Sequence, residues 1–378
     1  MRVLISGAGV AGLACGLRLA RAGHDAVVVE KAPEIREGGY LVALSHNAYH
    51  FAEDLGLVPC LRKRALTINA SAYLNASGKT LLSLDYNRMF GSLDIVQIMR
   101  EDLVRCLFEA AQECVEIRFS TRIDSLENST EGVAVTLSSG QTESFDLVVG
   151  ADGVHSHTRQ MAFEESEVYQ DVLGLWCAAF RSKNVLDLDR KFETHMDGDR
   201  YMATFTTREG DLGNVFVWAV DDVTPPKPED RAQTLLDAFD GAGDAISTVL
   251  KECPKDHPFY FDNPAQIVMK SWHRDRVVLA GDAAHSLTLF SGRGAACAFS
   301  GGNRLAQALI EQPSIPNALS EYDRQMRPLI ETVQPATRNA VRWYVPRKKW
   351  EHLVRDNLMA YLPNAFFQKY FQRKYSYS

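Results

Sequence analysis

The residues with the clearest chemical potential lie in the first thirty positions, where a glycine-rich turn follows a short apolar run. Gly7, Gly9 and Gly12 have the spacing GxGxxG. The first glycine permits a tight turn, the second lets the backbone approach a pyrophosphate, and the third allows close packing of the following helix. A second apolar run ends at Glu30, whose carboxylate would accept hydrogen bonds from a ribose and disfavours a 2′-phosphate there. These residues predict a bound adenine dinucleotide.

Two further apolar strands end on a glycine followed by an acidic residue. One ends at Gly150 and continues into Asp152 and Gly153, and the other ends at Gly281 and Asp282. Because the carboxyl ends of parallel strands meet at one edge of an open sheet, where ligands bind, these turns should converge on the same ligand. The sequence therefore predicts one nucleotide site built from three separate segments.

The segments between these turns have the pattern of an antiparallel sheet. Residues 71–84 predict a hairpin, and residues 172–267 predict aromatic-rich strands interrupted by one helix at 228–250. The predicted fold class is α/β, with a Rossmann-like nucleotide-binding domain interleaved with an antiparallel-sheet substrate domain and followed by a C-terminal helix. The predicted boundaries are 1–70, 96–170 and 268–342 for the nucleotide domain, 71–95 and 171–267 for the sheet domain, and 343–378 for the helix.

The composition is that of an ordinary globular protein and narrows the possible functions. The chain has 378 residues and a formal net charge of −7, which gives no support to a nucleic-acid partner. No apolar run is long enough to span a membrane, and a first strand beginning at Arg2 leaves no room for a signal peptide, so we expect a cytoplasmic protein. The seven cysteines are scattered without a CxxC pair, which predicts reduced, mostly buried thiols and no metal site.

The three glycine-acid segments resemble the signatures of the class A flavoprotein monooxygenases, the para-hydroxybenzoate hydroxylase family. The resemblance runs from residue 1 to about residue 342, with the signatures in the order and spacing of the family. Within it, the chain is most similar to the tetracycline-inactivating FAD monooxygenases, through residues 95–104, 259–262 and 267–272 and the C-terminal helix. The resemblance implies a nucleotide domain of the GR2 type that binds FAD, with NADPH as the reductant.

The resemblance also implies a set of FAD-binding positions drawn from all three segments and their connections. They are Gly7, Gly9, Ala11, Gly12, Glu30, Lys31, Arg36, Arg100, Asp152, Gly153, Gly281, Asp282, Arg293, Gly294, Ala295 and Ala296. Asp282 would face the ribityl-pyrophosphate part of FAD. Asp152 and Gly153 match the signature that supports FAD and, indirectly, NADPH binding.

One loop departs from the family pattern. Where the family has a proline-rich segment ending in Gln-Gly-x-Asn beside the flavin, residues 288–296 are Thr-Leu-Phe-Ser-Gly-Arg-Gly-Ala-Ala, and Ser300-Gly301 replaces the Glu-Asp that usually follows. Arg293 would place a positive charge near the flavin, where it stabilises the anionic reduced form, or near a phosphate or acidic substrate. The alternative is a guanidinium on the surface. The helix N-terminus at Gly294 can still face the flavin.

The activity implied by the resemblance is hydroxylation of an aromatic, polyketide or tetracycline-like small molecule through a flavin C4a-hydroperoxide. Such chemistry needs little acid-base machinery, because the cofactor carries the difficult step. The candidates for a catalytic contribution are His46 and Arg293. The substrate should lie between the flavin and the aromatic-rich sheet. Its candidate contacts are Tyr201, Phe205, Phe216, Trp218 and Phe290.

Three alternatives remain open on the same sequence. They are a Baeyer–Villiger or epoxidising variant, a flavin-dependent reductase of isoprenoid chains, and a non-catalytic flavin-binding protein. The C-terminal stretch from Trp350 to Phe371 is amphipathic with interleaved basic residues, so it either packs across both domains or lies on a membrane surface. The substrate and the choice between monomer and homodimer are not determined by the sequence.

Overall fold

The computed structural model of the chain describes residues 1–35, 38–90 and 93–375. In this part of the chain, six strands form one sheet, here called the parallel sheet, in the order β19-β20-β11-β1-β2-β7. All neighbours are parallel except the β19–β20 pair. Its strands are β1 (Arg2–Ser6), β2 (Asp25–Val29), β7 (Glu116–Arg118), β11 (Leu147–Gly150), β19 (His273–Arg274) and β20 (Val277–Leu279).

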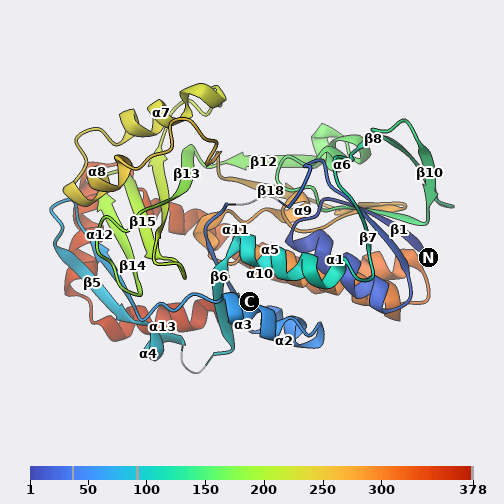
Figure 1. The fold of residues 1–378 in the computed structure, drawn as a ribbon, viewed down its shortest axis with the longest axis horizontal. Helices are drawn as coiled ribbons and strands as arrows, with labels where there is room; N and C mark the ends of the chain where they lie inside the picture. The colour runs from blue at the N-terminus through green and yellow to red at the C-terminus, as the bar shows by residue number, and fades with distance from the viewer. Residues whose placement is uncertain (36–37, 91–92, 376–378) are drawn as a thin grey trace.

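Layers of other elements cover both faces of the parallel sheet (Figure 1). Helices α1 (Val10–Arg21), α5 (Arg100–Ala111) and α10 (Gly294–Glu311) lie on one side. On the other side lies an antiparallel meander of β8 (Ile123–Asn128), β9 (Val133–Leu137) and β10 (Thr142–Phe145). The two central strands are buried almost throughout, β1 from Val3 to Ser6 and β11 from Leu147 to Gly150, as expected for a sheet covered on both faces. The predicted nucleotide-binding architecture is confirmed.

The second large sheet, here called the mixed sheet, has the strand order β17-β13-β16-β15-β14-β4-β5 among the described residues. Only β4 and β14 pair in parallel; the other neighbours are antiparallel. The hairpin of β4 and β5 confirms the prediction for residues 71–84. The strands are β4 (Ala70–Leu74), β5 (Thr80–Asp85), β13 (Leu175–Ser182), β14 (Lys191–Asp197), β15 (Arg200–Thr206), β16 (Leu212–Ala219) and β17 (Tyr260–Asp262).

Two short ribbons and several small helices connect the two sheets (Figure 1). The ribbons pair β3 (Leu41–Ser45) with β6 (Ile95–Met99), and β12 (Val168–Val172) with β18 (Ala265–Met269). The helices are α2 (Asn47–Asp54), α3 (Val58–Arg64), α4 (Tyr86–Phe90), α6 (His157–Ala162) and α9 (Asp282–His285), with 3-10 turns η1 (Glu165–Glu167) and η3 (Leu289–Ser291). Within the described ranges, no helix is long and apolar enough to cross a membrane.

Several predicted helices have different bounds in the structure. The helix expected at 228–250 is a 3-10 turn η2 (Pro228–Asp230) followed by α7 (Arg231–Ala238) and α8 (Asp244–Leu250). The break falls where Gly241 has a φ of +66°. Helix α11 (Ile315–Tyr344) is capped at its start by Ser314, whose side chain accepts a hydrogen bond from the Asn317 N–H. The single C-terminal helix is two helices, α12 (Lys349–Tyr361) and α13 (Asn364–Tyr375).

The cysteines also depart from the expectation of reduced thiols. Cys60 on α3 and Cys106 on α5 form a disulfide across 46 positions of sequence, with their Cα atoms 5.9 Å apart. The prediction is wrong at this pair because the contact depends on α3 packing against α5, which residue spacing does not reveal. The other cysteines are free. Cys15, Cys177, Cys253 and Cys297 are buried and Cys114 is exposed.

Candidate active site

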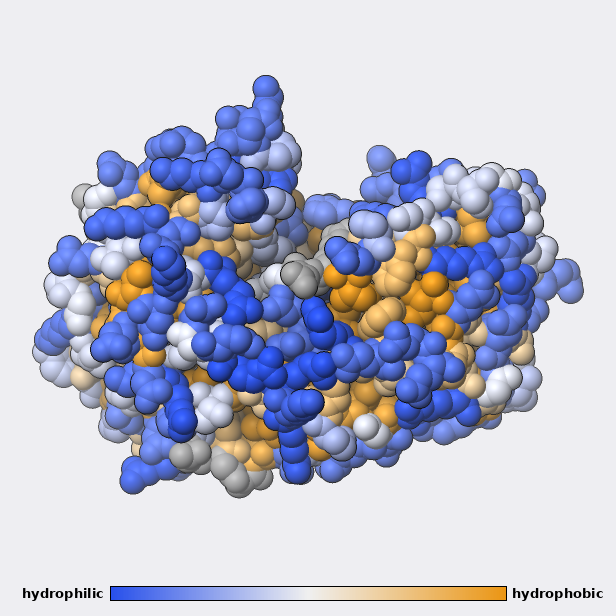
Figure 2. Space-filling model, viewed as in Figure 1, coloured by the Kyte–Doolittle hydropathy of each residue, from blue (hydrophilic) through white to orange (hydrophobic). Residues whose placement is uncertain are grey.

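A cavity of about 2460 Å³ lies between the parallel sheet and the mixed sheet. Its lining extends from the glycine turn after β1, past Asp282, to aromatic side chains of the mixed sheet. The surface is hollowed between the two parts of the molecule (Figure 2). Pockets for one drug-sized ligand usually have volumes of about 300 to 1,000 Å³. The cavity therefore has room for a dinucleotide and a second ligand together.

The glycine turn forms one end of the cavity and has the shape of a phosphate cradle. Gly7 has a φ of +110°, and a Cβ there would lie 2.5 Å from the Ala151 carbonyl oxygen. A Cβ on Gly12 would lie 2.0 Å from the Gly7 carbonyl oxygen. A Cβ on Gly9 would instead enter open space. Gly7 and Gly12 are thus required for the turn itself, whereas Gly9 leaves room for a ligand.

Helix α1 begins in this turn with its N-terminus open to the cavity. Its cap, Gly9, offers no side-chain hydrogen bond, and the first turn of α1 contains no acidic residue among those described. Free N–H groups and the positive end of the helix dipole at such a position favour an anion. The geometry therefore fits the pyrophosphate of a dinucleotide.

Glu30 is held on the cavity wall by backbone groups on both sides. Its carboxylate accepts hydrogen bonds from the N–H groups of Ala8 at 3.0 Å and of Ala32 at 2.9 Å. Lys31 lines the cavity beside it. This is the position expected for a ribose acceptor at the end of β2. Arg36 lies outside the described residues.

The second glycine-acid segment is held together by its own acidic residue. The Asp152 carboxylate accepts a hydrogen bond from the Ser156 hydroxyl. It accepts two more from Thr158, one from the N–H at 2.9 Å and one from the hydroxyl at 3.0 Å. It thereby fixes the start of α6. Asp152 and Gly153 both line the cavity.

Arg159 links this segment to the third one, a role that sequence reasoning missed. The side chain is buried, and its guanidinium donates to the carbonyl oxygens of Ala283 at 2.8 Å and Val154 at 2.7 Å. Burial lowers the pKa of Arg159, and the nearby Asp152 opposes that shift. Arg159 follows closely after Asp152 and Gly153 in the sequence, but nothing in the sequence showed which carbonyl groups it would bind.

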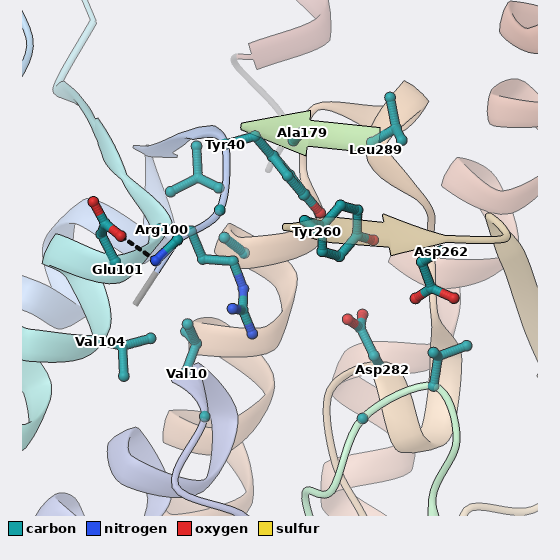
Figure 3. A pocket seen from close by; sticks show the side chains of 18 of the residues that line it. Val10, Tyr40, Arg100, Glu101, Val104, Ala179, Tyr260, Asp262, Asp282 and Leu289 are labelled. Atoms are coloured by element: carbon teal, nitrogen blue, oxygen red, sulfur yellow. Dashed lines mark hydrogen bonds between the residues drawn. The ribbon is translucent and has the colours of Figure 1, made fainter. Parts of the chain in front are cut away.

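Charged and phenolic side chains meet in the middle of the cavity (Figure 3). Arg100, Asp262 and Asp282 point into the same space from α5, β17 and α9. Asp282 lies deep in the protein, and burial raises its pKa, whereas Arg100 lowers it and Asp262 raises it further. Its side chain is nevertheless exposed to the open space of the cavity. Such a group is available to a ligand hydroxyl.

Two tyrosines lie above this acidic and basic cluster. The rings of Tyr40 and Tyr260 meet edge to face with centroids 5.8 Å apart. Burial raises the pKa of both phenols, so both are neutral at pH 7. Nearby, His155 lies 3.4 Å from Asp262, and this hydrogen bond raises the pKa of His155.

The loop that departs from the family pattern leads into the N-terminus of α10. Gly294 and Ala295 line the cavity, and the helix cap Arg293 makes no side-chain capping bond. The Arg293 side chain is buried, with 9% exposure, so the interpretation as a surface guanidinium is wrong. Its charge lowers the pKa of Cys297 against the larger effect of burial. Arg293 and Ala296 are absent from the described cavity lining.

The third turn is also shaped by close packing. Gly281 has a φ of +61°, and a Cβ there would lie 2.9 Å from the Ala11 Cβ. A Cβ on Gly302 of α10 would lie 2.2 Å from the Ala11 carbonyl oxygen. Helices α1 and α10 therefore approach closely, which brings both N-termini to one cavity.

The predicted substrate residues divide between the two faces of the mixed sheet. Tyr201 and Phe205 on β15 line the cavity with Phe290 of η3. Tyr201 pairs with Val217 on β16, so the alternating Phe216 and Trp218 point to the opposite face. There they pack in the core formed with α7 and α8. Phe216 and Trp218 are therefore removed from the candidate site, because register decides the face and composition does not.

The structure also places His46 away from the site. His46 is exposed, precedes α2 with a φ of +49°, and lies against His50 with ring centroids 6.2 Å apart. It is not among the described lining residues. In the same described part of the chain, no group of three or more His, Cys, Asp and Glu side chains is arranged to hold a metal ion.

The three glycine-acid turns, the two helix N-termini and the aromatic wall define a dinucleotide-dependent oxidoreductase of the class A flavoprotein type. The chain belongs to the family described as FAD binding domain, whose model matches residues 1–336. The protein is an FAD-binding enzyme, a flavin-dependent monooxygenase. FAD fits the residues present, because the Gly9 cradle is open and Glu30, Arg100 and Asp282 face one cavity.

Individual relatives support the same assignment. A flavin-dependent monooxygenase from an unknown prokaryotic organism is 30% identical over 349 residues, covering 88% of this chain and 87% of its own. A flavin-dependent monooxygenase of Legionella longbeachae serogroup 1 (strain NSW150) is 29% identical, with the same coverage. The crystal structure of the tetracycline destructase Tet(51) superposes with a TM-score of 0.83 at 26% identity, covering 100% of this chain and 98% of that one.

Proposed function

We propose that the enzyme uses NADPH and oxygen to hydroxylate a large, mainly apolar aromatic or polyketide compound of tetracycline-like size. The observation that carries this proposal is the single cavity that joins the dinucleotide cradle to an aromatic wall. Bound FAD would supply the redox chemistry and the transfer of oxygen. The chain itself has to bind the cofactor, orient the substrate and exclude water.

The cofactor-binding half of the cavity divides these tasks among residues already described. The turn at Gly9 and the N-terminus of α1 would hold the pyrophosphate, and Glu30 would accept hydrogen bonds from the adenosine ribose. Arg100 and Asp282 would hold the middle of FAD, where the aspartate can accept from a ribityl hydroxyl. The N-terminus of α10 at Gly294 would stabilise negative charge on the flavin ring.

The other half of the cavity favours an uncharged, ring-containing substrate. Of the described residues on β4, β5, β14 and β15, those that line the cavity are uncharged: Ser71, Tyr73, Leu84, Phe192, Thr194, Tyr201, Ala203 and Phe205. Tyr201, Phe290 and Tyr344 form a contiguous aromatic corner, with ring centroids 5.9 to 6.4 Å apart. Such a wall binds flat rings and keeps water away from the reacting atoms. The tetracycline destructase relative supports a polycyclic substrate.

The experiment is incubation of the flavin-loaded enzyme with NADPH or NADH and a panel of tetracyclines, phenols and small aromatic acids. The proposal predicts that polycyclic, neutral compounds stimulate NADPH consumption and that aromatic acids do not. Stimulation by small acids alone would contradict the substrate assignment. Reduction of the flavin by NADH but not by NADPH would contradict the proposal that NADPH is the reductant. We also propose a cytoplasmic location, which cell fractionation tests.

A further inference from the structure

The outer face of α12 is apolar although it faces away from the protein. Trp350, Leu353, Val354, Leu358 and Tyr361 recur at three- and four-residue spacing and are 60%, 65%, 46%, 39% and 83% exposed. We call these five side chains the outer stripe. A contiguous exposed patch of this kind marks an interaction surface, whereas single exposed apolar residues need no explanation.

The inner face of α12 packs against the rest of the protein, so the outer stripe is not the face by which the helix is held to the fold. Met359 is 3% exposed and packs with Leu84 of β5 and Phe90 of α4. Arg355, which is 2% exposed, donates to the Tyr344 carbonyl oxygen at 3.2 Å. Helix α12 thus has two apolar faces, one packed against the protein and one exposed to solvent. Figure 1 shows α12 and α13 beside β5 and α4, at the end of the molecule far from the N-terminus.

The charge of this region is opposite to that of the whole chain. The segment from Arg347 to Ser378 contains seven basic and two acidic residues, whereas the whole chain has a net charge of −7. Both acidic side chains have local partners. Glu351 accepts from the Lys348 N–H at 3.1 Å, and Asp356 pairs with Arg355 at 2.8 Å. In the sequence, the exposed Lys348 precedes the outer stripe and the exposed Lys369 follows it.

We infer that the outer stripe docks on an anionic lipid surface. An apolar helix face with aromatic residues near both ends and flanking cations is the pattern of a helix that lies in the membrane interface. Anionic headgroups would attract the flanking lysines, and the acyl region would take up Trp350, Leu353 and Tyr361. A second copy of the chain would bring the same cations together in a two-fold contact, which is unfavourable. This inference is independent of the proposed reaction.

The test is flotation of the full chain with vesicles of phosphatidylcholine containing phosphatidylglycerol, and with vesicles of phosphatidylcholine alone. We expect binding to the anionic vesicles that weakens as salt is added. The triple variant Trp350→Ser, Leu353→Ser, Tyr361→Ser should bind more weakly by on the order of tenfold or more, since three large apolar side chains no longer enter the interface. Tyr169→Ser, at a tyrosine 61% exposed elsewhere, is the matched control and should bind like the unmodified chain.

Two further measurements keep the inference testable. The fluorescence of Trp350, isolated as the difference between the unmodified chain and Trp350→Phe, should shift to shorter wavelength on anionic vesicles. Failure of the unmodified chain to bind, or equal binding by the triple variant, would overturn the inference. So would a dimer in sedimentation equilibrium that the triple variant dissociates, because the stripe would then belong to a second copy.

Discussion

Arg159 offers the sharpest test of how the site is assembled, because its buried guanidinium joins two of the three turns. Arg159→Met keeps an unbranched side chain but removes the bonds to the carbonyl oxygens of Val154 and Ala283. Each buried carbonyl left without a donor costs about 1 to 3 kcal/mol. With two such carbonyls, we expect the free energy of unfolding to fall by about 2 to 6 kcal/mol. Because Ala283 follows Asp282, FAD should also be held more weakly.

Urea unfolding, followed by far-UV circular dichroism at a fixed FAD concentration, measures the first effect, and flavin retained after gel filtration measures the second. The matched control is Arg274→Met. Arg274 also donates to a backbone carbonyl, that of Ala162 at 3.1 Å, but its side chain is 40% exposed. Its loss should cost less than about 1 kcal/mol. Equal losses in the two variants would refute the reasoning that burial makes the Arg159 link strong.

Four other substitutions test separate parts of the protein. Gly9→Glu places a carboxylate in the cradle and should abolish FAD binding. If the purified variant is still yellow, the glycine turn does not hold the FAD pyrophosphate. Burial lowers the pKa of His285 to about 4 from 6.5, so the folded protein loses about 3 kcal/mol of stability as the pH falls from 6.5 towards 4. In His285→Gln this loss of stability should be absent when unfolding midpoints are compared across the same pH range. If the variant's stability depends on pH as that of the unmodified chain does, His285 is not the source of the loss. Tyr201→Ala should raise the KM for substrate on the order of tenfold with little change in flavin content. Trp218→Ala should mainly lower the melting temperature. The reverse pattern would show that Trp218, and not Tyr201, lies on the face of the mixed sheet that contacts the substrate.

The nucleotide half of the fold was predictable because its constraints are local. The spacing of Gly7, Gly9 and Gly12 fixes a turn through steric contacts within a few residues, and Glu30 follows directly from the end of β2. Three apolar runs ending in glycine and an acid sufficed to predict a shared sheet edge. The structure places Glu30, Asp152 and Asp282 along one cavity in agreement with that expectation.

The substrate half was less predictable because it depends on register and on contacts distant in sequence. Phe216 and Trp218 alternate as regularly as Tyr201 and Phe205, and only the pairing of Tyr201 with Val217 shows that the two sets face opposite sides. The Cys60–Cys106 disulfide depends on how two helices pack.

Two further contributions to the site came from tertiary packing alone. Tyr40 and Tyr260 meet across the cavity although they are 220 residues apart in the sequence, and no sequence motif predicts this contact. Arg159 reaches Ala283 because α6 lies beside β20, so that its role depends on the fold and not on its own signature.

The most direct test of the proposed function is turnover under oxygen-18 gas, with NADPH and the compound that most stimulates its consumption. The cavity that joins the FAD cradle to the aromatic wall predicts a product heavier by one oxygen-18 atom, formed in step with NADPH oxidation. An unlabelled product, or NADPH oxidation that yields only hydrogen peroxide with every compound of the panel, would contradict oxygen transfer to a substrate held at that wall.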